Sequence, residues 1–357
     1  MQVGIIGMPL SGKTTIYNAL TGSQAETANY SSGQVAIHTA VVRVPDPRVD
    51  LLSSLFNPKK TTYAQIQFND VSGISEGAGG KGFDPQVINA ISKCDALLQV
   101  VRGFDNPLLE TEAQPADDLA TLRFELIVSD LAIVERRIER IDAGYKKARG
   151  DEKALLDQER ALLVRFQEAL EAERLISDLE LTEDEAHLIR GFQFLTAKPS
   201  MAICNLAEDQ SIDIDLSWAN HHRNVSALAL QGALEMEIAQ LGDEDKTLFL
   251  DEYGISEPGL HRMVRASYDL LGLMSFFTVG EDEVRAWTVR RDASAVEAAG
   301  AIHSDLARGF IRAEVISYDD MVACQTLANA RKEGKLRLEG KTYTVQDGDV
   351  ISIRFNV

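Results

Sequence analysis

The sequence predicts an α/β protein whose strands form a mostly parallel sheet, with an inserted helical hairpin and a small C-terminal domain containing β-strands. Three observations support this fold class. Short apolar runs alternate with helical segments, the stretch 116–191 has a helical periodicity, and short alternating strands with turn residues follow residue 274. We therefore expect a main domain at 1–115 and 192–274, a hairpin at 116–191, and a C-terminal domain at 275–357.

The main domain is predicted from a series of short apolar runs. The first, residues 2–6, has the pattern of a buried parallel strand. A helix is expected at 13–20, because Ile16 and Leu20 lie four residues apart on one helical face. The further expected strands are 35–44, 64–68, 96–101 and 200–204.

Residues 116–191 predict two amphipathic helices. Apolar residues recur at spacings of three and four from Phe124 to Ile141 and again from Leu155 to Leu170, between positions rich in Glu, Arg and Lys. A turn at 144–150 separates the two stretches. This pattern favours an antiparallel hairpin resembling a short coiled coil, and the alternative is a packed two-helix lobe of the main domain.

The C-terminal domain is predicted from short strands with turn residues between them. Strands are expected at 284–289, 336–338, 343–345 and 350–354, and Asp347-Gly348 is expected to turn the chain between the last two. The result would be a small α+β domain.

Composition sets limits on partners and location. No apolar run reaches the roughly 20 residues of a membrane span. Cys94, Cys204 and Cys324 are far apart, which favours a reducing cytoplasm over a disulfide framework. The net charge of −19 disfavours non-specific binding of nucleic acid. The stretch 275–357 has 11 Lys+Arg and 13 Asp+Glu, so an RNA contact there is compatible with its local charge.

Residues 7–14 match the phosphate-binding pattern G-x-x-x-x-G-K-[ST] and stand between an expected strand and an expected helix. Backbone N–H groups of such a loop, together with the helix N-terminus, bind phosphate. We expect Lys13 to contact the β- and γ-phosphates and act in catalysis, and the Thr14 hydroxyl to bind Mg²⁺. The alternative is a glycine-rich turn with a solvated lysine. The expected nucleotide-binding residues of this segment are Gly7, Pro9, Leu10, Ser11, Gly12, Lys13, Thr14 and Thr15.

Residues 70–73, with the pattern D-x-x-G, follow the expected strand 64–68. Asp70 at the end of a strand can hold a water on the Mg²⁺, and Gly73 can present its N–H to the γ-phosphate as a catalytic group. The glycine-rich stretch 77–82 is either a nucleotide-sensitive switch or an ordinary flexible loop.

The segment 205–208 is expected to recognise the base. GTPases of this organisation have Asn-Lys-x-Asp here, where the aspartate binds guanine N1–H and the 2-amino group. This chain has Asn205, Leu206 and Glu208 at those positions. After the strand-like Asn224-Val225, a backbone N–H at Ser226-Ala227 would complete the pocket. The longer Glu208 side chain and the loss of the lysine favour ATP, with GTP bound more weakly.

The order of these segments resembles the Obg-like ATPase family, also called the YchF family, within the translation-factor-related P-loop GTPases. The resemblance covers nearly the whole chain through 44–48, 100–104, 205–208, 302–306, 309–315 and 340–357. The last segment resembles the family's TGS domain, a ubiquitin-like β-grasp module. The resemblance implies a P-loop G domain interrupted by a helical hairpin, ATP preferred over GTP, and association with ribosomes.

The chain departs from the family pattern at residues that bear on catalysis. Gln34 stands where a switch threonine is usual, and the loop 105–115 lacks the histidine proposed to be catalytic in the family. Ile74 stands where Ras-like GTPases have a water-orienting glutamine. His38 is the only nearby substitute, although a solvated strand histidine is the simpler interpretation.

Three functions follow from these residues. The first is a slow ATPase that works as a switch. The second is a binding module whose ATP sets its conformation for a ribosomal or protein partner, with negligible hydrolysis. The third, a GTPase, is disfavoured by Leu206 and Glu208.

Overall fold

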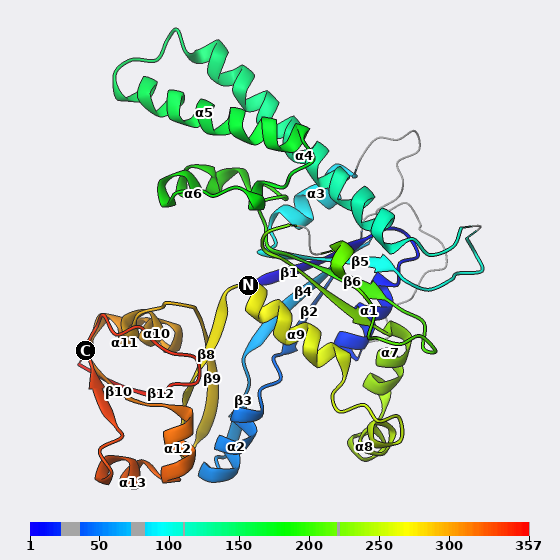
Figure 1. The fold of residues 1–357 in the computed structure, drawn as a ribbon. Coiled ribbons are helices and arrows are strands. Elements are labelled where there is room, and N and C mark those ends of the chain that lie inside the picture. Colours follow the sequence, from blue (N-terminus) through cyan, green and yellow to red (C-terminus); the bar gives the residue numbers. More distant parts are fainter. Residues whose placement is uncertain (23–35, 73–82, 110, 220–221, 357) are drawn as a thin grey trace. The chain divides into compact units, whose positions relative to one another are not determined.

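The computed structural model describes residues 1–22, 36–72, 83–109, 111–219 and 222–356 (Figure 1). The chain divides into two compact units. The first comprises Met1–Ala40 and Gln67–Leu260, and the second comprises Val41–Ile66 and His261–Val357. Each unit has its own sheet and its own apolar core.

The first unit is built on a six-stranded sheet in the order β2-β4-β1-β5-β6-β7. Neighbours from β4 to β7 run parallel, so their carboxyl ends meet along one edge, where α/β proteins bind ligands. The strands are β1 (Gln2–Gly7), β2 (Ala36–Arg43), β4 (Gln65–Ser72), β5 (Ala96–Arg102), β6 (Ser200–Asn205) and β7 (Val225–Leu230).

Helices cover both faces of this sheet, with α3 and α4 on one side and α1 and α7 on the other (Figure 1). On the α3 side, Ile6, Val71 and Leu97 of the strands pack against Ile91 of α3 and Leu122 of α4. The helices of this unit are α1 (Lys13–Thr21), α3 (Pro85–Ser92), α4 (Pro115–Gly144), α5 (Asp151–Glu171), α6 (Glu183–Ile189), α7 (Gly232–Gln240) and α8 (Asp243–Glu252), and α9 (Gly259–Leu270) leads into the second unit.

The helices α4 and α5 form the predicted hairpin (Figure 1). Arg137 of α4 and Glu159 of α5 pair through two contacts of 2.7 and 2.8 Å. At the base of the hairpin, the fully buried Asp130 accepts hydrogen bonds from the backbone N–H groups of Leu195 and Thr196 at 2.9 and 2.7 Å. Together with the parallel sheet, this hairpin confirms the predicted fold class.

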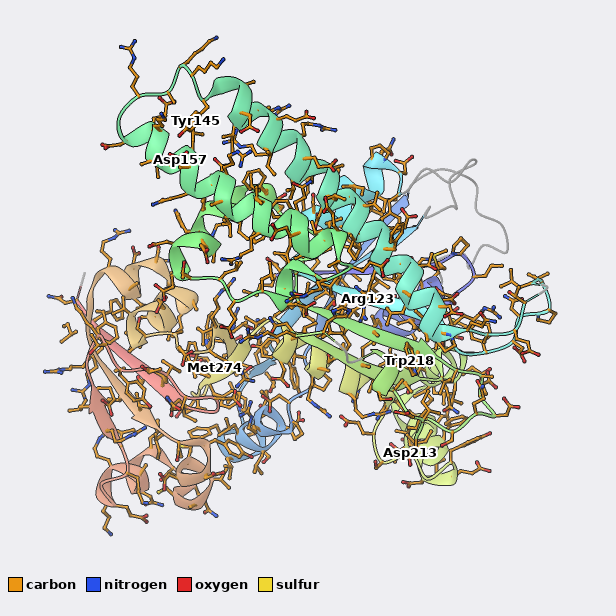
Figure 2. All side chains as sticks on the ribbon, turned by 45° about the horizontal axis from the view of Figure 1, so that its top comes forward. Arg123, Tyr145, Asp157, Asp213, Trp218 and Met274 are labelled. Atoms are coloured by element: carbon orange, nitrogen blue, oxygen red, sulfur yellow. The ribbon has the colours of Figure 1, made fainter. Side chains whose placement is uncertain are left out.

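A buried arginine fixes the start of α4 to the sheet. Arg123 donates to Gln99 Oε1 of β5 at 3.2 Å and to the carbonyl of Ala219 at 3.1 Å (Figure 2). Burial lowers the pKa of Arg123 to about 10. The same turn, Ser217–Ala219, carries Trp218, whose indole N–H donates to the carbonyl of Asp215.

The second unit has a six-stranded sheet in the order β11-β10-β12-β8-β9-β3. Its core forms where Phe276, Ala313 and Ile351 of the sheet pack against Ala295 and Ala299 of α10. The elements are α2 (Pro47–Phe56), β3 (Lys60–Thr62), β8 (Leu273–Thr278), β9 (Glu283–Arg290), α10 (Ala295–Ile302), α11 (Ser304–Arg308), β10 (Phe310–Ile316), α12 (Tyr318–Cys324), α13 (Leu327–Lys332), β11 (Arg337–Glu339) and β12 (Val350–Phe355).

One strand prediction for this unit is wrong. Residues 343–345 form no strand, and Thr344 makes only an isolated bridge to Ser294. The strand β12 pairs with β10 and with β8, and not with residues 343–345. Residues 347–348, just before β12, lie against β8. There Asp347 accepts from the Ser275 N–H at 3.0 Å, and the Gly348 N–H donates to the Ser275 carbonyl at 2.8 Å.

The segment 41–66 lies in the second unit, although its residues fall within the expected main domain 1–115. Asp46 caps α2, with Pro47 in its first turn, and Arg48 pairs with Asp347 at 2.9 Å. Residues of β3 pair with β9 in parallel. These contacts pair the segment with residues far along the chain. A division of the sequence into consecutive stretches could not show this pairing. The three-part division remains a prediction.

Candidate functional site

The phosphate-binding loop lies between β1, which ends at Gly7, and α1, which begins at Lys13. At Gly7 a Cβ atom would lie 2.2 Å from the Val100 carbonyl oxygen, so this position admits only glycine. Gly12 has a φ of 87°, in the left-handed region, and its Cβ would lie 2.1 Å from Asn205 Nδ2. The two glycines therefore allow the tight curl that the sequence pattern predicts.

Lys13 is buried beside the loop backbone. Its Nζ donates to the carbonyls of Gly7 and Met8 at 2.8 and 2.9 Å. Burial lowers the pKa of Lys13 to about 8, against a smaller opposing effect from the Asp70 carboxylate. A lysine held this way can exchange its carbonyl partners for phosphate oxygens, which favour its charged form.

The loop fits a phosphate group for two further reasons. The Ser11 hydroxyl is buried and has no hydrogen-bond partner in the described part of the chain. The N-terminus of α1 has no side-chain cap, so its first N–H groups are available to an anion. The other predicted loop residues lie nearby in sequence: Pro9 is exposed, Leu10 has a φ of 61°, and Thr15 is half-buried.

Thr14 and Asp70 come together as a candidate Mg²⁺ site. The Thr14 hydroxyl donates to Asp70 Oδ2 at 3.3 Å, and Asp70 is fully buried. Within the described ranges, no group of three or more His, Cys, Asp or Glu residues could hold a metal ion. Mg²⁺ keeps several waters and is bound by one or two protein oxygens plus substrate phosphates, which fits Thr14 and Asp70.

The predicted catalytic Gly73, the departures Gln34 and Ile74, and the possible switch 77–82 all lie outside the described residues. His38 is described: it is exposed on β2, and its ring centroid lies 6.1 Å from that of Tyr17 on α1. The buried Arg102 donates to the carbonyl of Phe104, just before the loop 105–115, and to those of Thr111 and Glu112 in its second half.

Asn205 lies at the end of β6 and connects two segments. Its Nδ2 donates to the Ser11 carbonyl at 3.1 Å, and its Oδ1 accepts from the Gly232 N–H at 2.9 Å. The residue is almost completely buried. Asn205 therefore holds the phosphate-binding loop against the start of α7.

The side chains of Leu206 and Glu208, which follow Asn205, lie in different environments. Leu206 is 4% exposed and packs in an apolar cluster with Val101 and Ala219, whereas the Glu208 side chain is exposed. The Glu208 carbonyl accepts from Gln231 Nε2 at 2.9 Å. The backbone of this loop is thus fixed, while the carboxylate extends into solvent.

Ser226 and Ala227 do not lie where the sequence analysis placed them. They are inside β7, paired with Met201 and Ala202, whereas β7 ends at Leu230. The prediction ended this strand at Val225, five residues before its end at Leu230. The residues at the carboxyl edge are Gln231 and Gly232, and no sequence pattern marked them.

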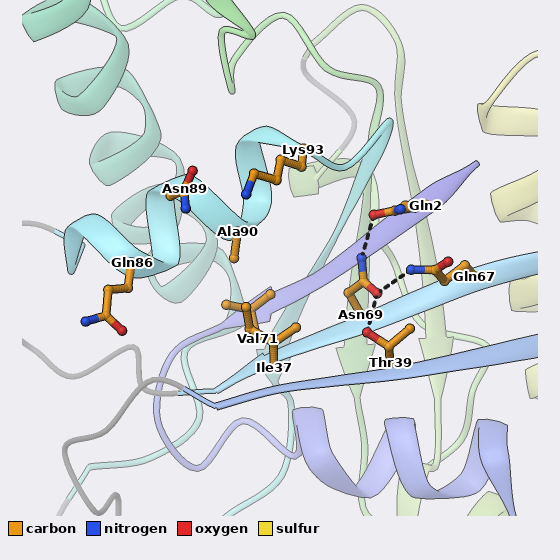
Figure 3. Close-up of a pocket in the computed structure, with 10 residues that line it drawn as sticks. All are labelled: Gln2, Ile37, Thr39, Gln67, Asn69, Val71, Gln86, Asn89, Ala90 and Lys93. Atoms are coloured by element: carbon orange, nitrogen blue, oxygen red, sulfur yellow. Dashed lines mark hydrogen bonds between the residues drawn. The ribbon is translucent and has the colours of Figure 1, made fainter.

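A separate groove lies between α3 and strands β1, β2 and β4, with a volume of about 360 Å³ (Figure 3). Asn69 is central to its floor: it accepts from Thr39 and Gln67 and donates to Gln2, at 3.0 to 3.1 Å. Because strand side chains alternate, Asn69 faces this groove while its neighbour Asp70 reaches Thr14. The groove is therefore distinct from the phosphate-binding loop.

Two family models match this chain. Residues 2–127 match one described as a 50S ribosome-binding GTPase, and residues 273–356 match YchF-GTPase_C, described as a protein of unknown function. None of the helices in the described part of the chain has the length and apolar character needed to cross a bilayer.

Individual relatives match over the full length. The chain is 40% identical to the ribosome-binding ATPase YchF of Bacillus subtilis (strain 168), with 100% of both chains covered. It is 42% identical to that of Haemophilus ducreyi, covering 100% of this chain and 99% of the relative. The solved structure of the Schizosaccharomyces pombe YchF GTPase superposes with a TM-score of 0.86 at 28% identity, covering 99% of this chain and 97% of that one.

Proposed function

The chain belongs to the YchF family, and from this premise we propose that it is an ATP-binding switch protein that hydrolyses slowly and acts with the ribosome. The observation that carries the proposal is the phosphate-binding loop with Lys13 beside it and Thr14 hydrogen-bonded to Asp70. The curated relatives are named ribosome-binding ATPases, and their names supply the partner.

We assign roles as follows. Lys13 and the backbone of residues 7–15 bind the triphosphate, and Thr14 and Asp70 hold Mg²⁺, which would neutralise charge on the phosphates. Gly73 would present its N–H to the γ-phosphate. Catalysis then rests on positioning and charge stabilisation, since neither the loop 105–115 nor position 74 supplies a residue to orient water.

Preference for ATP over GTP is the finer part of the proposal. The names of similar proteins include both ATPase and GTPase, so they do not decide the base. Leu206 in place of lysine and Glu208 in place of aspartate support ATP. We expect ATP to bind at least about ten-fold more tightly than GTP, which corresponds to ~1.4 kcal/mol.

A nucleotide-dependent binding module with negligible hydrolysis is the second candidate. It is favoured by the absence of histidine from 105–115 and by Gln34 in the first switch region. The two candidates are separated by measuring ATP and GTP affinity by calorimetry, and turnover with and without ribosomes. Turnover near the ~1–100 s⁻¹ of protein kinases without ribosomes would contradict both.

We further propose that residues 275–357 contact ribosomal RNA. Arg290, Lys332 and Lys341 are exposed there. Changing all three to Gln in the full chain should weaken co-sedimentation with ribosomes and flatten its steep salt dependence, while ATP binding stays unchanged. Unchanged co-sedimentation and salt dependence would move the contact to the helical hairpin.

A further inference from the structure

Three side-chain amides meet at the edge of the sheet where β6 and β7 end. Each of them donates to at least one backbone carbonyl. Asn205 donates to Ser11 at 3.1 Å, and Gln210 donates to Gly103 at 3.0 Å. Gln231 donates to both Glu208 and Gln210, at 2.9 and 2.7 Å. Both N–H bonds of Gln231 are therefore occupied, whereas Asn205 and Gln210 each use one N–H of two for these contacts.

The three amide oxygens differ in whether they accept a hydrogen bond. The oxygen of Asn205 accepts from the Gly232 N–H at 2.9 Å, and that of Gln210 accepts from the Ala207 N–H at 2.6 Å. The Gln231 oxygen accepts no hydrogen bond from any of the described residues. Among these three amides, Gln231 alone has an oxygen that accepts no hydrogen bond from the described residues, so both of its lone pairs are available to a ligand.

The orientation of the Gln231 amide follows from its partners. Both partners are carbonyl oxygens, which only accept, so the NH₂ group and not the oxygen must face them. A flipped amide would place three acceptors together. The Oε1 atom is therefore directed away from the loop 205–210.

Gln231 also lies at the edge of the sheet where the base of a bound nucleotide is expected. It connects the end of β7 to α7, next to Gly232, and Gly232 is linked through Asn205 to the phosphate-binding loop. Parallel α/β sheets bind ligands outside the carboxyl ends of their strands. The Gly232 N–H, a backbone donor at this edge, is already committed to Asn205.

We propose that Gln231 is a specificity-determining residue, whose Oε1 accepts a hydrogen bond from the 6-amino group of adenine. A purine with a 6-oxo group would bring its oxygen against Oε1, and the two acceptors would repel each other. This inference rests on the proposed function, because it requires a nucleotide in the phosphate-binding loop with its base at this edge.

The test compares ligands that differ at purine position 6, where the 6-oxo ligand also carries a hydrogen on N1. ATP, purine riboside triphosphate, which has hydrogen there, and inosine triphosphate, which has oxygen, are titrated calorimetrically with Mg²⁺ against the full chain. One neutral hydrogen bond predicts that ATP binds about three- to ten-fold more tightly than purine riboside triphosphate. Inosine triphosphate should bind more weakly than both.

The protein side of the test uses Gln231→Leu. This variant should bind ATP only as tightly as purine riboside triphosphate. Any loss from removing the bonds to Glu208 and Gln210 affects both ligands equally, so the ratio of the two affinities measures the hydrogen bond to the 6-amino group. Gln240→Leu is the matched control, because Gln240 is an exposed glutamine at the other end of α7. It should leave all three affinities unchanged.

The outcomes separate this inference from the function it rests on. Equal affinity of the unmodified chain for ATP and purine riboside triphosphate would overturn the role of Gln231 even if Gln231→Leu fails to fold. Equal losses for both ligands in Gln231→Leu would also overturn it, since Gln231 would then only hold the loop. Failure of every triphosphate to bind would overturn the proposed function itself, and this inference with it.

Discussion

The phosphate end and the base end of the candidate site are built by different means. At the phosphate end, backbone conformations at Gly7 and Gly12 form the loop, and one buried lysine accompanies them. At the base end, three side-chain amides connect segments that are distant in sequence. A site made from local backbone has a contiguous sequence pattern, whereas a site made from side chains on separate loops does not.

The largest effect is expected from Lys13→Ala, which removes the only side-chain charge at the phosphate end that the sequence pattern identifies. Loss of its charge-assisted bonds to phosphate should weaken ATP binding by roughly 100-fold or more. Calorimetry measures the affinity, and circular dichroism checks the fold. The control is Lys93→Ala, at an exposed lysine in the separate groove. Unchanged ATP affinity in folded Lys13→Ala would refute the assignment of the loop.

The phosphate end and the base end are in contact where Gly12 packs against Asn205, so Gly12→Ala tests this contact. The added Cβ would clash with Asn205 Nδ2, and alanine is also strained at this φ of 87°. We expect a loss of about 1–3 kcal/mol in the free energy of unfolding, together with weaker binding of every nucleotide. Urea denaturation measures the stability.

Gly22→Ala is the matched control for Gly12→Ala. Gly22 has a φ of 61° and none of the described residues lies within 4 Å of the added Cβ, so this variant isolates the backbone strain. It should cost less stability than Gly12→Ala and leave nucleotide affinity unchanged. Equal costs for the two variants would mean that the contact with Asn205 contributes nothing.

Asn205→Ala distinguishes a clamp from a base-reading residue. The change leaves the Ser11 carbonyl and the Gly232 N–H without their partner, so the phosphate-binding loop should loosen. We expect ATP and GTP to lose affinity by a similar factor, about ten-fold for ~1.4 kcal/mol. A loss confined to one of the two nucleotides would show instead that Asn205 contacts the base.

The protonation of Lys13 gives a pH test of the phosphate end alone. Its pKa of about 8 in the free protein means that Lys13 loses its proton above pH 8, and a bound triphosphate restores it. ATP affinity should therefore fall as pH rises above about 8, by at most about ten-fold per pH unit. For the stability of the free protein the sign is opposite. Between pH 8 and 10.5 the unfolded chain binds more protons than the folded chain, so the contribution of Lys13 to the free energy of unfolding rises with pH.

Lys13→Met supplies the control for that profile. It keeps much of the volume of the side chain without a titrating group, so its residual ATP affinity should lose the decline above pH 8. A decline that persists in Lys13→Met would assign the titration to another group.

The same comparison explains what the sequence could predict. Five strands of the first sheet (β1, β2, β4, β5 and β6), the hairpin and residues 7–14 follow from local periodicity and from one contiguous pattern, so they could be expected from the chain alone. Ser226 and Ala227 were misplaced because a short apolar run does not show where a strand ends, and β7 continues to Leu230. Gln210 and Gln231 could not be found, because a loop glutamine has no pattern until folding brings the carbonyls of Gly103 and Glu208 to it.

The smallest effect is expected at Glu208, which the sequence analysis made central to the choice of base. Because its carboxylate is exposed, Glu208→Asp should change the ratio of ATP to GTP affinity by less than about three-fold, or ~0.6 kcal/mol. Glu237→Asp, at an exposed glutamate of α7, is the control. Adding Leu206→Lys, which the sequence analysis would use to favour GTP, places an ammonium group in the apolar cluster around Val101. We therefore expect the double variant to lose stability before it gains GTP affinity, as thermal denaturation would show. A ten-fold shift towards GTP in Glu208→Asp alone would mean that this carboxylate reaches the base. The segment 205–208, and not Gln231, would then recognise the base.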